Sequence, residues 1–156
     1  MKVTQNLWFD KDMEAAIGLY TSLIPNSALE WTSALPAESP SGPAGSVKIA
    51  AFTIGGQRYQ AFEAWRSDTF NHTFSIFVEC ETQAEIDRLW EALGEGGKFE
   101  QCGWLRDRWG LSWQIAPKRL GELTRDPDRA KARRVAEAML KMVKLDIAAL
   151  EAAAKG

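Results

Sequence analysis

The sequence predicts an α+β protein in which a βαβββ unit occurs twice and is followed by a helical C-terminal extension. Alternating apolar and polar residues indicate strands, whereas apolar residues three or four positions apart indicate helices. Taken in order, these patterns give βαβββ over about residues 1–67 and again over 68–120. Residues 121–156 show helical patterns only. We therefore expect one paired domain over 1–120 and a separate helical extension.

The first unit begins with a strand over residues 3–9, where apolar and polar side chains alternate. Asp10 lies in the expected N-cap region of the next segment, which has the apolar spacing of a helix and ends at Pro25. Residues 27–35 predict a second strand. The following segment, 36–45, is rich in proline, serine and glycine and predicts a surface loop.

Two further strands, over residues 47–54 and 57–65, complete the first unit and are joined by a Gly-Gly pair that is typical of a hairpin turn. The second unit starts with a strand over 72–79. A helix then begins after Thr82, and Glu85 completes the capping-box pattern of its first turn. The order of elements therefore repeats.

The second unit ends with three short strands, for which we expect the ranges 98–103, 104–106 and 111–116. In the extension, Asp126 and Pro127 predict the start of a helix with proline at its first position. Asp146 is expected to cap a final short helix. The apolar stripes of these helices indicate that they pack on their own domain or on a partner subunit.

Composition excludes several classes of function. The chain has 156 residues, of which 46% are hydrophobic, and a formal net charge of −2. Its lysines and arginines are dispersed, which argues against a nucleic-acid partner, and its apolar runs are too short for a membrane span. The first residues lack the pattern of a signal peptide, so we expect a cytoplasmic protein. Cys80 and Cys102 lack metal-binding spacing and are expected to be reduced thiols.

The segment GLSWQIAP, residues 110–117, predicts a strand with an unusual face. Side chains alternate along a strand, so Gln114 shares one face with Ser112 and Ala116 while the apolar residues share the other. If the first face meets water, Gln114 is an ordinary surface residue. If that face lines a cavity, the amide points at a ligand.

Glu63 is predicted to lie among aromatic side chains, because its strand face also carries Tyr59 and Trp65. A carboxylate is costly to bury unless it is paired, hydrogen-bonded or bound to a metal. The alternative is that Glu63 lies on an edge strand and faces water. Gln5 presents a similar choice, since it shares its face with apolar side chains. Its amide is either an enclosed ligand or a buried group bonded to the backbone.

His72 is the only histidine of the chain, and its imidazole suits metal binding or proton transfer, with a structural role as the alternative. Three charged residues, Arg106, Asp107 and Arg108, flank a predicted turn and are expected to be solvated. Cys102 is expected to be a structural thiol rather than a nucleophile, because no neighbouring base is apparent.

Five segments carry a resemblance to a known family: LWFD (7–10), LYTSLIPNS (19–27), FNHTFSIFVECE (70–81), QCGWLRDRWGLSWQIAP (101–117) and KMVKLDIAALEAA (141–153). With them the chain resembles the vicinal-oxygen-chelate superfamily of glyoxalase I, bleomycin-resistance proteins and ring-cleaving dioxygenases. Within it, the chain looks like the PhnB-like branch, often labelled demethylubiquinone methyltransferase-like. The resemblance implies that the two βαβββ units form a cupped mixed sheet with a divalent metal in the cup.

In that superfamily the metal takes one ligand from the first strand and one from a late strand of each unit. Carried over to this chain, the resemblance implies Gln5 and Glu63 in the first unit. In the second unit it implies Gln114 together with His72 or its neighbour Thr73. Gln114 is therefore expected to face the cup. This oxygen-rich set would suit Ni²⁺, Co²⁺, Mn²⁺, Fe²⁺ or Zn²⁺.

The activity that the resemblance implies is lyase or isomerase chemistry on a small oxygenated substrate. The metal would act as a Lewis acid and Glu63 would move the proton. Tyr59, Trp65 and Trp104 are expected in the substrate pocket. The alternative is a protein that binds or sequesters a small molecule without a metal, as bleomycin-resistance relatives do, with 36–45 as a lid. Relatives commonly dimerise, so we expect a homodimer.

Two activities of relatives do not suit this sequence. Ring-cleaving dioxygenases need two histidines and a carboxylate for Fe(II), and the chain has one histidine. Methyl transfer from an adenosyl cofactor is also disfavoured, because the sequence lacks a glycine-rich turn between a strand and a helix.

Overall fold

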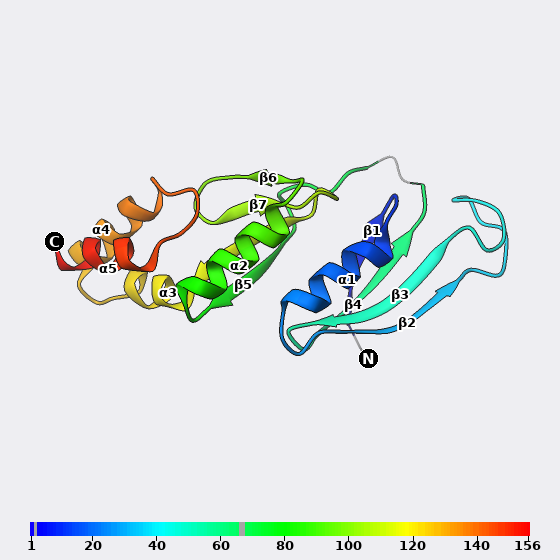
Figure 1. Ribbon diagram of the computed structural model, residues 1–156, viewed down its shortest axis with the longest axis horizontal. Helices are drawn as coiled ribbons and strands as arrows, with labels where there is room; N and C mark the ends of the chain where they lie inside the picture. Colours follow the sequence, from blue (N-terminus) through cyan, green and yellow to red (C-terminus); the bar gives the residue numbers. More distant parts are fainter. Residues whose placement is uncertain (2, 66–67) are drawn as a thin grey trace. The chain divides into compact units, whose positions relative to one another are not determined.

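The computed structural model describes residues 1, 3–65 and 68–156. The chain divides into two compact units, Met1–Thr69 and Phe70–Gly156, which are described one at a time (Figure 1). Each unit contains a four-stranded mixed sheet with a helix on one face, and three more helices follow at the C-terminal end. The predicted α+β class with a repeated βαβββ order is therefore confirmed.

The first unit has the strand order β1-β4-β3-β2, in which β1 is parallel to β4 and the other neighbours are antiparallel. Helix α1 lies across one face of this sheet (Figure 1). The elements are β1 (Gln5–Phe9), α1 (Met13–Leu23), β2 (Ala28–Ala34), β3 (Lys48–Ile54) and β4 (Gln57–Glu63). The tight connection between β3 and β4 is the predicted Gly-Gly turn.

The core of the first unit lies between α1 and the sheet. The helix contributes its apolar stripe and the strands contribute alternate residues, as their periodicities require: Met13, Ala16, Ile17, Tyr20, Leu7, Phe9, Ala50, Phe52 and Ala61. The opposite face is more open, with Trp8 and Trp31 exposed. Strand β2 is exposed along its whole length.

Three boundaries in the first unit differ from the predicted ones. The first strand begins at Gln5 rather than residue 3, and the last ends at Glu63 rather than 65. The N-cap of α1 is Asp12, not the predicted Asp10, and its side chain makes no capping hydrogen bond. Asp12 has a φ of 58°, which lies in the left-handed region. The cap of α1 is supplied by a residue elsewhere in the chain.

The second unit repeats the arrangement with the order β5-β8-β7-β6, and β5 is parallel to β8. Helix α2 covers one face of the sheet (Figure 1). The elements are β5 (Ser75–Cys80), α2 (Gln83–Gly94), β6 (Lys98–Phe99), β7 (Trp104–Arg106) and β8 (Ser112–Pro117). The predicted capping box is confirmed, because Thr82 and Glu85 each bond the other's backbone N–H.

Alternate residues of this sheet face α2 and form the core of the second unit, namely Ile76, Leu105, Trp113 and Ile115 against Ile86, Leu89 and Leu93. The indole of Trp90 stacks on Phe99 with ring centroids 5.0 Å apart. The predicted strand 72–79 begins only at Ser75, so His72 lies in the turn before it. The predicted strand 98–103 is limited to its first two residues.

The C-terminal part contains α3 (Lys118–Thr124), α4 (Arg129–Met139) and α5 (Ile147–Lys155). Helix α3 was not predicted, because its seven residues are too few to show a clear period. The helix expected at Asp126 and Pro127 begins at Arg129, after the cap Asp128. Asp146 caps α5, as predicted.

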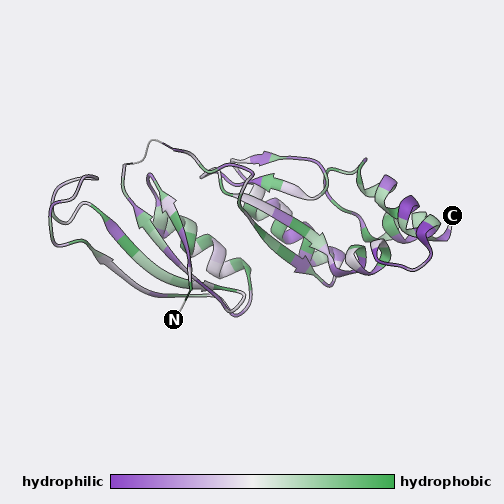
Figure 2. Ribbon diagram, turned by 180° about the vertical axis from the view of Figure 1, so that it is seen from behind, coloured by the Kyte–Doolittle hydropathy of each residue, from purple (hydrophilic) through white to green (hydrophobic). Residues whose placement is uncertain are grey.

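The three C-terminal helices share a small core of Leu123, Val135 and Leu150. Purple and green segments alternate along them in Figure 2, as expected for helices with one buried face. The segment before α5 is bonded to the turn before β7, because Cys102 and Gly103 donate to the carbonyls of Met142 and Val143, each at 2.8 Å. Among the described residues, no helix is long and apolar enough to cross a bilayer.

Candidate functional site

The face of the second sheet that points away from α2, here called the open face, carries most of the polar and aromatic groups that could meet a ligand. Cross-strand pairs define it: Ser75 lies opposite Ser112, Phe77 and Trp104 lie opposite Gln114, and Lys98 lies opposite Arg106. Their neighbours along each strand point into the core. Phe77 is 57% exposed, so this face is not covered within the unit.

A charged group at the edge of the open face joins His72, Glu100 and Arg106. The Nε2 atom of His72 lies 2.6 Å from Oε2 of Glu100. Both Nε and Nη2 of Arg106 lie 3.1 Å from Oε1 of the same carboxylate. Lys98 approaches that oxygen at 3.6 Å. One carboxylate is thus held by three basic side chains that arise from a turn and two short strands.

Glu100 is the centre of this group, and only 16% of its side chain is exposed. Burial raises the pKa of the Glu100 carboxyl, but the hydrogen bonds and charges of His72 and Arg106 outweigh it, so the net pKa lies below its ordinary value. Glu100 is therefore ionised at neutral pH. Such a carboxylate accepts hydrogen bonds and does not donate them.

Aromatic surface lies next to this charged group. The ring of His72 lies 5.8 Å from that of Trp104 with an interplanar angle of 51°. Trp104 is half-buried, and its backbone carbonyl accepts the N–H of Glu100 at 2.9 Å. Together with the exposed ring of Phe77, this gives the open face apolar area beside a polar edge.

Gln114 lies on the open face, which is the geometry that would direct its amide at a ligand. Its Nε2 donates to the hydroxyl of Ser75 at 2.8 Å, and the amide keeps a carbonyl oxygen to offer. Next to it, Ser112 is fully buried, and within the described part of the chain its hydroxyl has no hydrogen-bond partner. Unsatisfied buried hydroxyls are uncommon and are often explained by a bound water or ligand.

Glu63, the predicted catalytic residue, serves the structure of the first unit. One carboxylate oxygen accepts the backbone N–H of Met13 at 2.8 Å and so caps α1, in place of the missing Asp12 cap. The other oxygen lies 2.9 Å from Nζ of Lys48. The hydrogen bond and charge of Glu63 raise the pKa of Lys48. Glu63 is thus on the face covered by α1, and both of its oxygens are engaged.

Gln5 lies on the same face as Glu63 but at the other end of the strand pair. Gln5 pairs with Tyr59 and Phe9 pairs with Glu63, so four residues of extended strand, about 13 Å, separate the two predicted ligands. The Gln5 side chain is exposed and accepts a hydrogen bond from Gln57 at 3.0 Å. The first unit therefore does not bring Gln5 and Glu63 together.

The predicted pocket residues have different surroundings. Tyr59 is in the core of the first unit, stacked on Phe52 at 5.4 Å, and burial raises the pKa of its hydroxyl. Trp65 is 75% exposed at the end of the first unit. Trp104 lies beside His72 in the second unit. The structure brings Trp104 together with His72 and Gln114, because all three lie on or beside the open face.

The two ligands predicted in the first unit, Gln5 and Glu63, do not converge on a single metal ion. A divalent ion needs several donors within about 2.0–2.6 Å, and Gln5 and Glu63 lie too far apart to share one. Glu63 is also engaged by Lys48 and the α1 cap. Over residues 3–65 and 68–156, no three side chains of His, Cys, Asp or Glu form a group that could hold a metal.

The two cysteines are free, as predicted. Burial is the main reason that the pKa of the Cys80 thiol rises to about 11, so Cys80 is an inert thiol at neutral pH. Cys102 is partly exposed, and its φ of 59° places it in the left-handed region at the turn that contacts Met142. Neither thiol lies on the open face as defined by the strand pairs.

One prediction in the turn before β8 is wrong. Asp107 was expected to be solvated, but it is only 3% exposed. Its carboxylate accepts the N–H groups of Trp109 and Leu111 and the indole N–H of Trp113. Arg106 is engaged as well, by Glu100. Sequence reasoning could find the Arg106 contact only by pairing β6 with β7, which sets Lys98 opposite Arg106 and leaves Glu100 two residues further along, on the same face.

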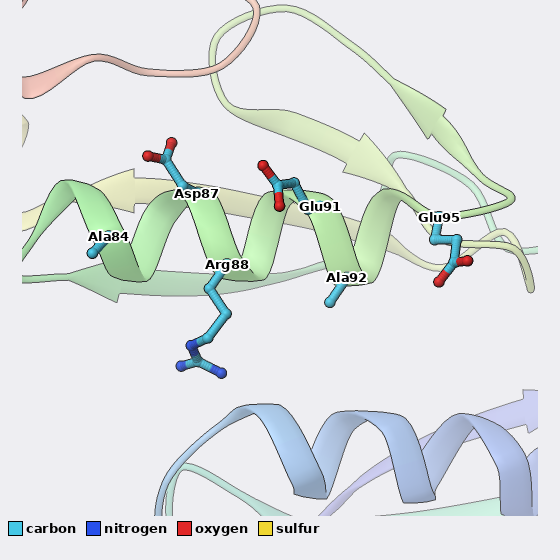
Figure 3. Close-up of a pocket in the computed structure, with 6 residues that line it drawn as sticks. All are labelled: Ala84, Asp87, Arg88, Glu91, Ala92 and Glu95. Carbon is cyan, nitrogen blue, oxygen red and sulfur yellow. The ribbon is translucent and has the colours of Figure 1, made fainter.

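A shallow region along α2 is a further concave surface, and Figure 3 draws the residues that line it: Ala84, Asp87, Arg88, Glu91, Ala92 and Glu95. Five of them come from α2 and Glu95 is its C-cap, and Arg88 points away from Asp87 and Glu91 (Figure 3). Asp87 is held by Lys144 at 2.6 Å. Binding sites need groups that converge from several elements, so this surface is a solvated helix face.

Replacing Glu63 tests its structural role. We expect Glu63→Gln to lower the free energy of unfolding by about 1 kcal/mol, because the α1 N-terminus loses a negative charge and Lys48 loses its partner. Urea unfolding at neutral pH measures this difference. Folding raises the pKa of Lys48. The contribution of the Lys48–Glu63 ion pair to stability is therefore complete below the pKa of Lys48 in the unfolded chain, and it is lost as the pH rises through the pKa of Lys48 in the folded protein.

The matched control is Glu30→Gln, which breaks the exposed ion pair with Arg58 and should change the stability by less than about 0.5 kcal/mol. If Glu63→Gln proved as neutral as this control, Glu63 would have no structural function and would be free for ligand chemistry.

Comparison with known proteins identifies the family. Residues 1–116 match the model of the family described as 3-demethylubiquinone-9 3-methyltransferase. The chain belongs to this family. A PhnB protein from Bacillus cereus is 32% identical, with a TM-score of 0.66, and the match covers 75% of this chain and 99% of that one. These matches place the present PhnB-like chain in the vicinal-oxygen-chelate superfamily.

More distant structures share the fold of this PhnB-like chain. A protein from Pseudomonas aeruginosa is 21% identical with a TM-score of 0.57 over 75% of this chain and 97% of that one. The fosfomycin resistance protein FosX from Listeria monocytogenes, complexed with Mn(II) and sulfate ion, is 15% identical with a TM-score of 0.53, over 74% and 89%. A comparison with curated proteins finds no match. The family match ends before α3, α4 and α5.

Proposed function

We propose that this PhnB-like protein binds a small planar organic molecule on the open face of its second sheet. The observation that carries the proposal is the combination of His72, held by Glu100, with the ring of Trp104 beside it. Phe77 and Trp104 would supply stacking area, and each aromatic contact is worth about 0.5–1.5 kcal/mol beyond its buried area. Gln114 would fix the orientation of the molecule through its carbonyl oxygen.

The contacts of the carboxylates near the predicted ligands favour binding of a small molecule without a metal. Glu63 is committed to Lys48 and α1, and the carboxylate of Glu100 is committed to three basic groups. A cation placed at Glu100 would be repelled by Arg106 and Lys98. Binding or sequestration of a small molecule is therefore our first candidate, and we propose no methyl transfer, since the chain lacks a turn for an adenosyl cofactor.

Metal-dependent lyase or isomerase chemistry is the second candidate. It is favoured by the likeness of the fold to that of FosX, whose structure is a complex with Mn(II). In this chain the metal would supply Lewis-acid chemistry when bound, and Glu63 would have to leave Lys48 and the cap of α1 in order to move a proton. We also propose a cytoplasmic homodimer, because the first sheet leaves Trp8 and Trp31 exposed and a second copy would cover such surface.

Calorimetric titration with 1-naphthol and 1-naphthoate, with and without EDTA, tests the first candidate. We expect binding to the wild type in both conditions and a weakening of about tenfold in Trp104→Ala, which corresponds to about 1.4 kcal/mol. Trp31→Ala is the matched control, because Trp31 is also partly exposed but lies on the first sheet. Binding that disappears in EDTA and returns with Mn²⁺ would overturn this candidate and favour the second.

A further inference from the structure

We infer that His72 accepts a proton from a bound ligand that carries an acidic hydroxyl, such as a phenol or an enol, and that Glu100 and Arg106 are positioning residues for this step. The inference rests on the proposed ligand site of the open face and names the chemical class of its ligand. The observation behind it is the chain of contacts from Arg106 through Glu100 to the imidazole.

The contact with Glu100 determines which ring nitrogen of His72 is available. The ionised Glu100 carboxylate can only accept a hydrogen bond, so Nε2 of His72 carries the hydrogen that it donates. In the neutral ring, the lone pair is then on Nδ1. Within the described part of the chain Nδ1 makes no hydrogen bond. The imidazole therefore presents one basic atom to a ligand.

The charges around Glu100 keep the ring in this orientation. Arg106 binds the carboxylate with two nitrogens at 3.1 Å, and Lys98 adds a second positive group at 3.6 Å. A carboxylate fixed in this way fixes the imidazole plane in turn. Nε2 of His72 lies 2.6 Å from this fixed carboxylate, so the ring that receives the proton is held in one orientation.

The neighbouring rings define the shape of the ligand. Trp104 flanks the imidazole at 5.8 Å, and Phe77 lies on the same face across β8. A planar ligand stacked on these rings would lie at the polar edge of the open face, where its hydroxyl can meet Nδ1.

The step is a proton transfer without change of oxidation state. The O–H bond of the ligand breaks, an N–H bond forms at Nδ1, and the electron pair stays on the ligand oxygen. The products are a phenolate or enolate and an imidazolium that remains bonded to Glu100 through Nε2. No metal, oxidant or further reactant is required.

The test uses 4-nitrophenol, whose phenolate absorbs at longer wavelength than the phenol, and 4-nitroanisole, which has the same ring but no acidic hydroxyl. The full-length protein is titrated with each probe one pH unit below the pKa of free 4-nitrophenol. We expect the wild type to bind 4-nitrophenol as the phenolate. We expect His72→Gln to reduce the bound phenolate about tenfold, and Glu100→Gln to reduce it several-fold, each measured relative to the affinity of the same variant for 4-nitroanisole.

The outcomes separate the inference from the proposed function. If both probes bind the wild type but 4-nitrophenol remains a phenol, the inference is overturned and the proposed function stands. If neither probe binds, the proposed function fails as well. Trp31→Ala is the control and should match the wild type with both probes. Equal losses of 4-nitrophenol and 4-nitroanisole binding in His72→Gln would also overturn the inference, because the ring would then act through packing alone.

Discussion

Asp107→Asn is expected to lower the free energy of unfolding by about 3 kcal/mol. In the native protein, Oδ1 of Asp107 accepts the N–H groups of Trp109 and Leu111 at 3.0 and 3.1 Å, and Oδ2 accepts the indole N–H of Trp113 at 2.9 Å. Asparagine replaces one oxygen by an amide that only donates, so at least one of these buried donors then faces another donor. Leaving a buried group unpaired costs about 1–3 kcal/mol, and charged partners raise the cost.

A double-mutant cycle with Trp113→Phe identifies the contact responsible. Phenylalanine has no ring N–H, so the amide of Asp107→Asn no longer meets a donor on residue 113. We expect Asp107→Asn to lower the free energy of unfolding by at least about 1 kcal/mol less in the Trp113→Phe background than in the wild type, as measured by urea unfolding. Equal costs in both backgrounds would show that the indole bond contributes nothing specific.

Gly103→Ala is expected to destabilise the protein by about 3 kcal/mol or more. Gly103 has a φ of +80°, which L-residues rarely adopt, and an added methyl group would lie 2.6 Å from the Ile115 carbonyl oxygen and 2.9 Å from Cδ1 of Leu145. The Gly103 carbonyl also accepts the N–H of Ile115 at 2.8 Å, so the backbone has little room to move. Urea unfolding followed by circular dichroism measures the loss.

The control for this substitution is Gly18→Ala in α1, where nothing lies within 4 Å of the added methyl group. It should stabilise the protein by up to about 1 kcal/mol, because alanine favours a helix over glycine. Limited proteolysis adds a local measurement: Gly103→Ala should speed cleavage between α4 and α5, since the Val143 contact is lost. Unchanged cleavage and stability would show that the turn tolerates a side chain.

Much of the fold could be predicted because its signals are local. The alternation in β4 and β8, the apolar stripe of α2 and the Thr82 capping box all depend on residues a few positions apart. Helix α3 escaped prediction because it has seven residues and follows a strand without a loop. The N-terminus of α1 was misplaced because its cap comes from β4 and not from the neighbouring aspartates.

The candidate site was less predictable, because its contacts join residues far apart in the sequence. The placement of Gln114 on the open face follows from strand alternation alone. The partners of His72 and Glu63 do not, since Glu100 lies 28 residues beyond His72 and Met13 lies 50 residues before Glu63. Asp107 was misjudged for a related reason: a charged residue in a turn is usually solvated, and only the fold shows three donors converging on it.

The capping of α1 by Glu63 also bears on how the first unit folds. The first turn of a helix is the costly part of its formation, and local caps normally offset this cost while the rest of the chain is still disordered. Here the cap arrives with β4, the last strand of the unit, 50 residues further along the chain. We therefore expect α1 to remain frayed at its N-terminus in early folding intermediates. The closure of a long loop then completes helix and sheet in one late, cooperative step.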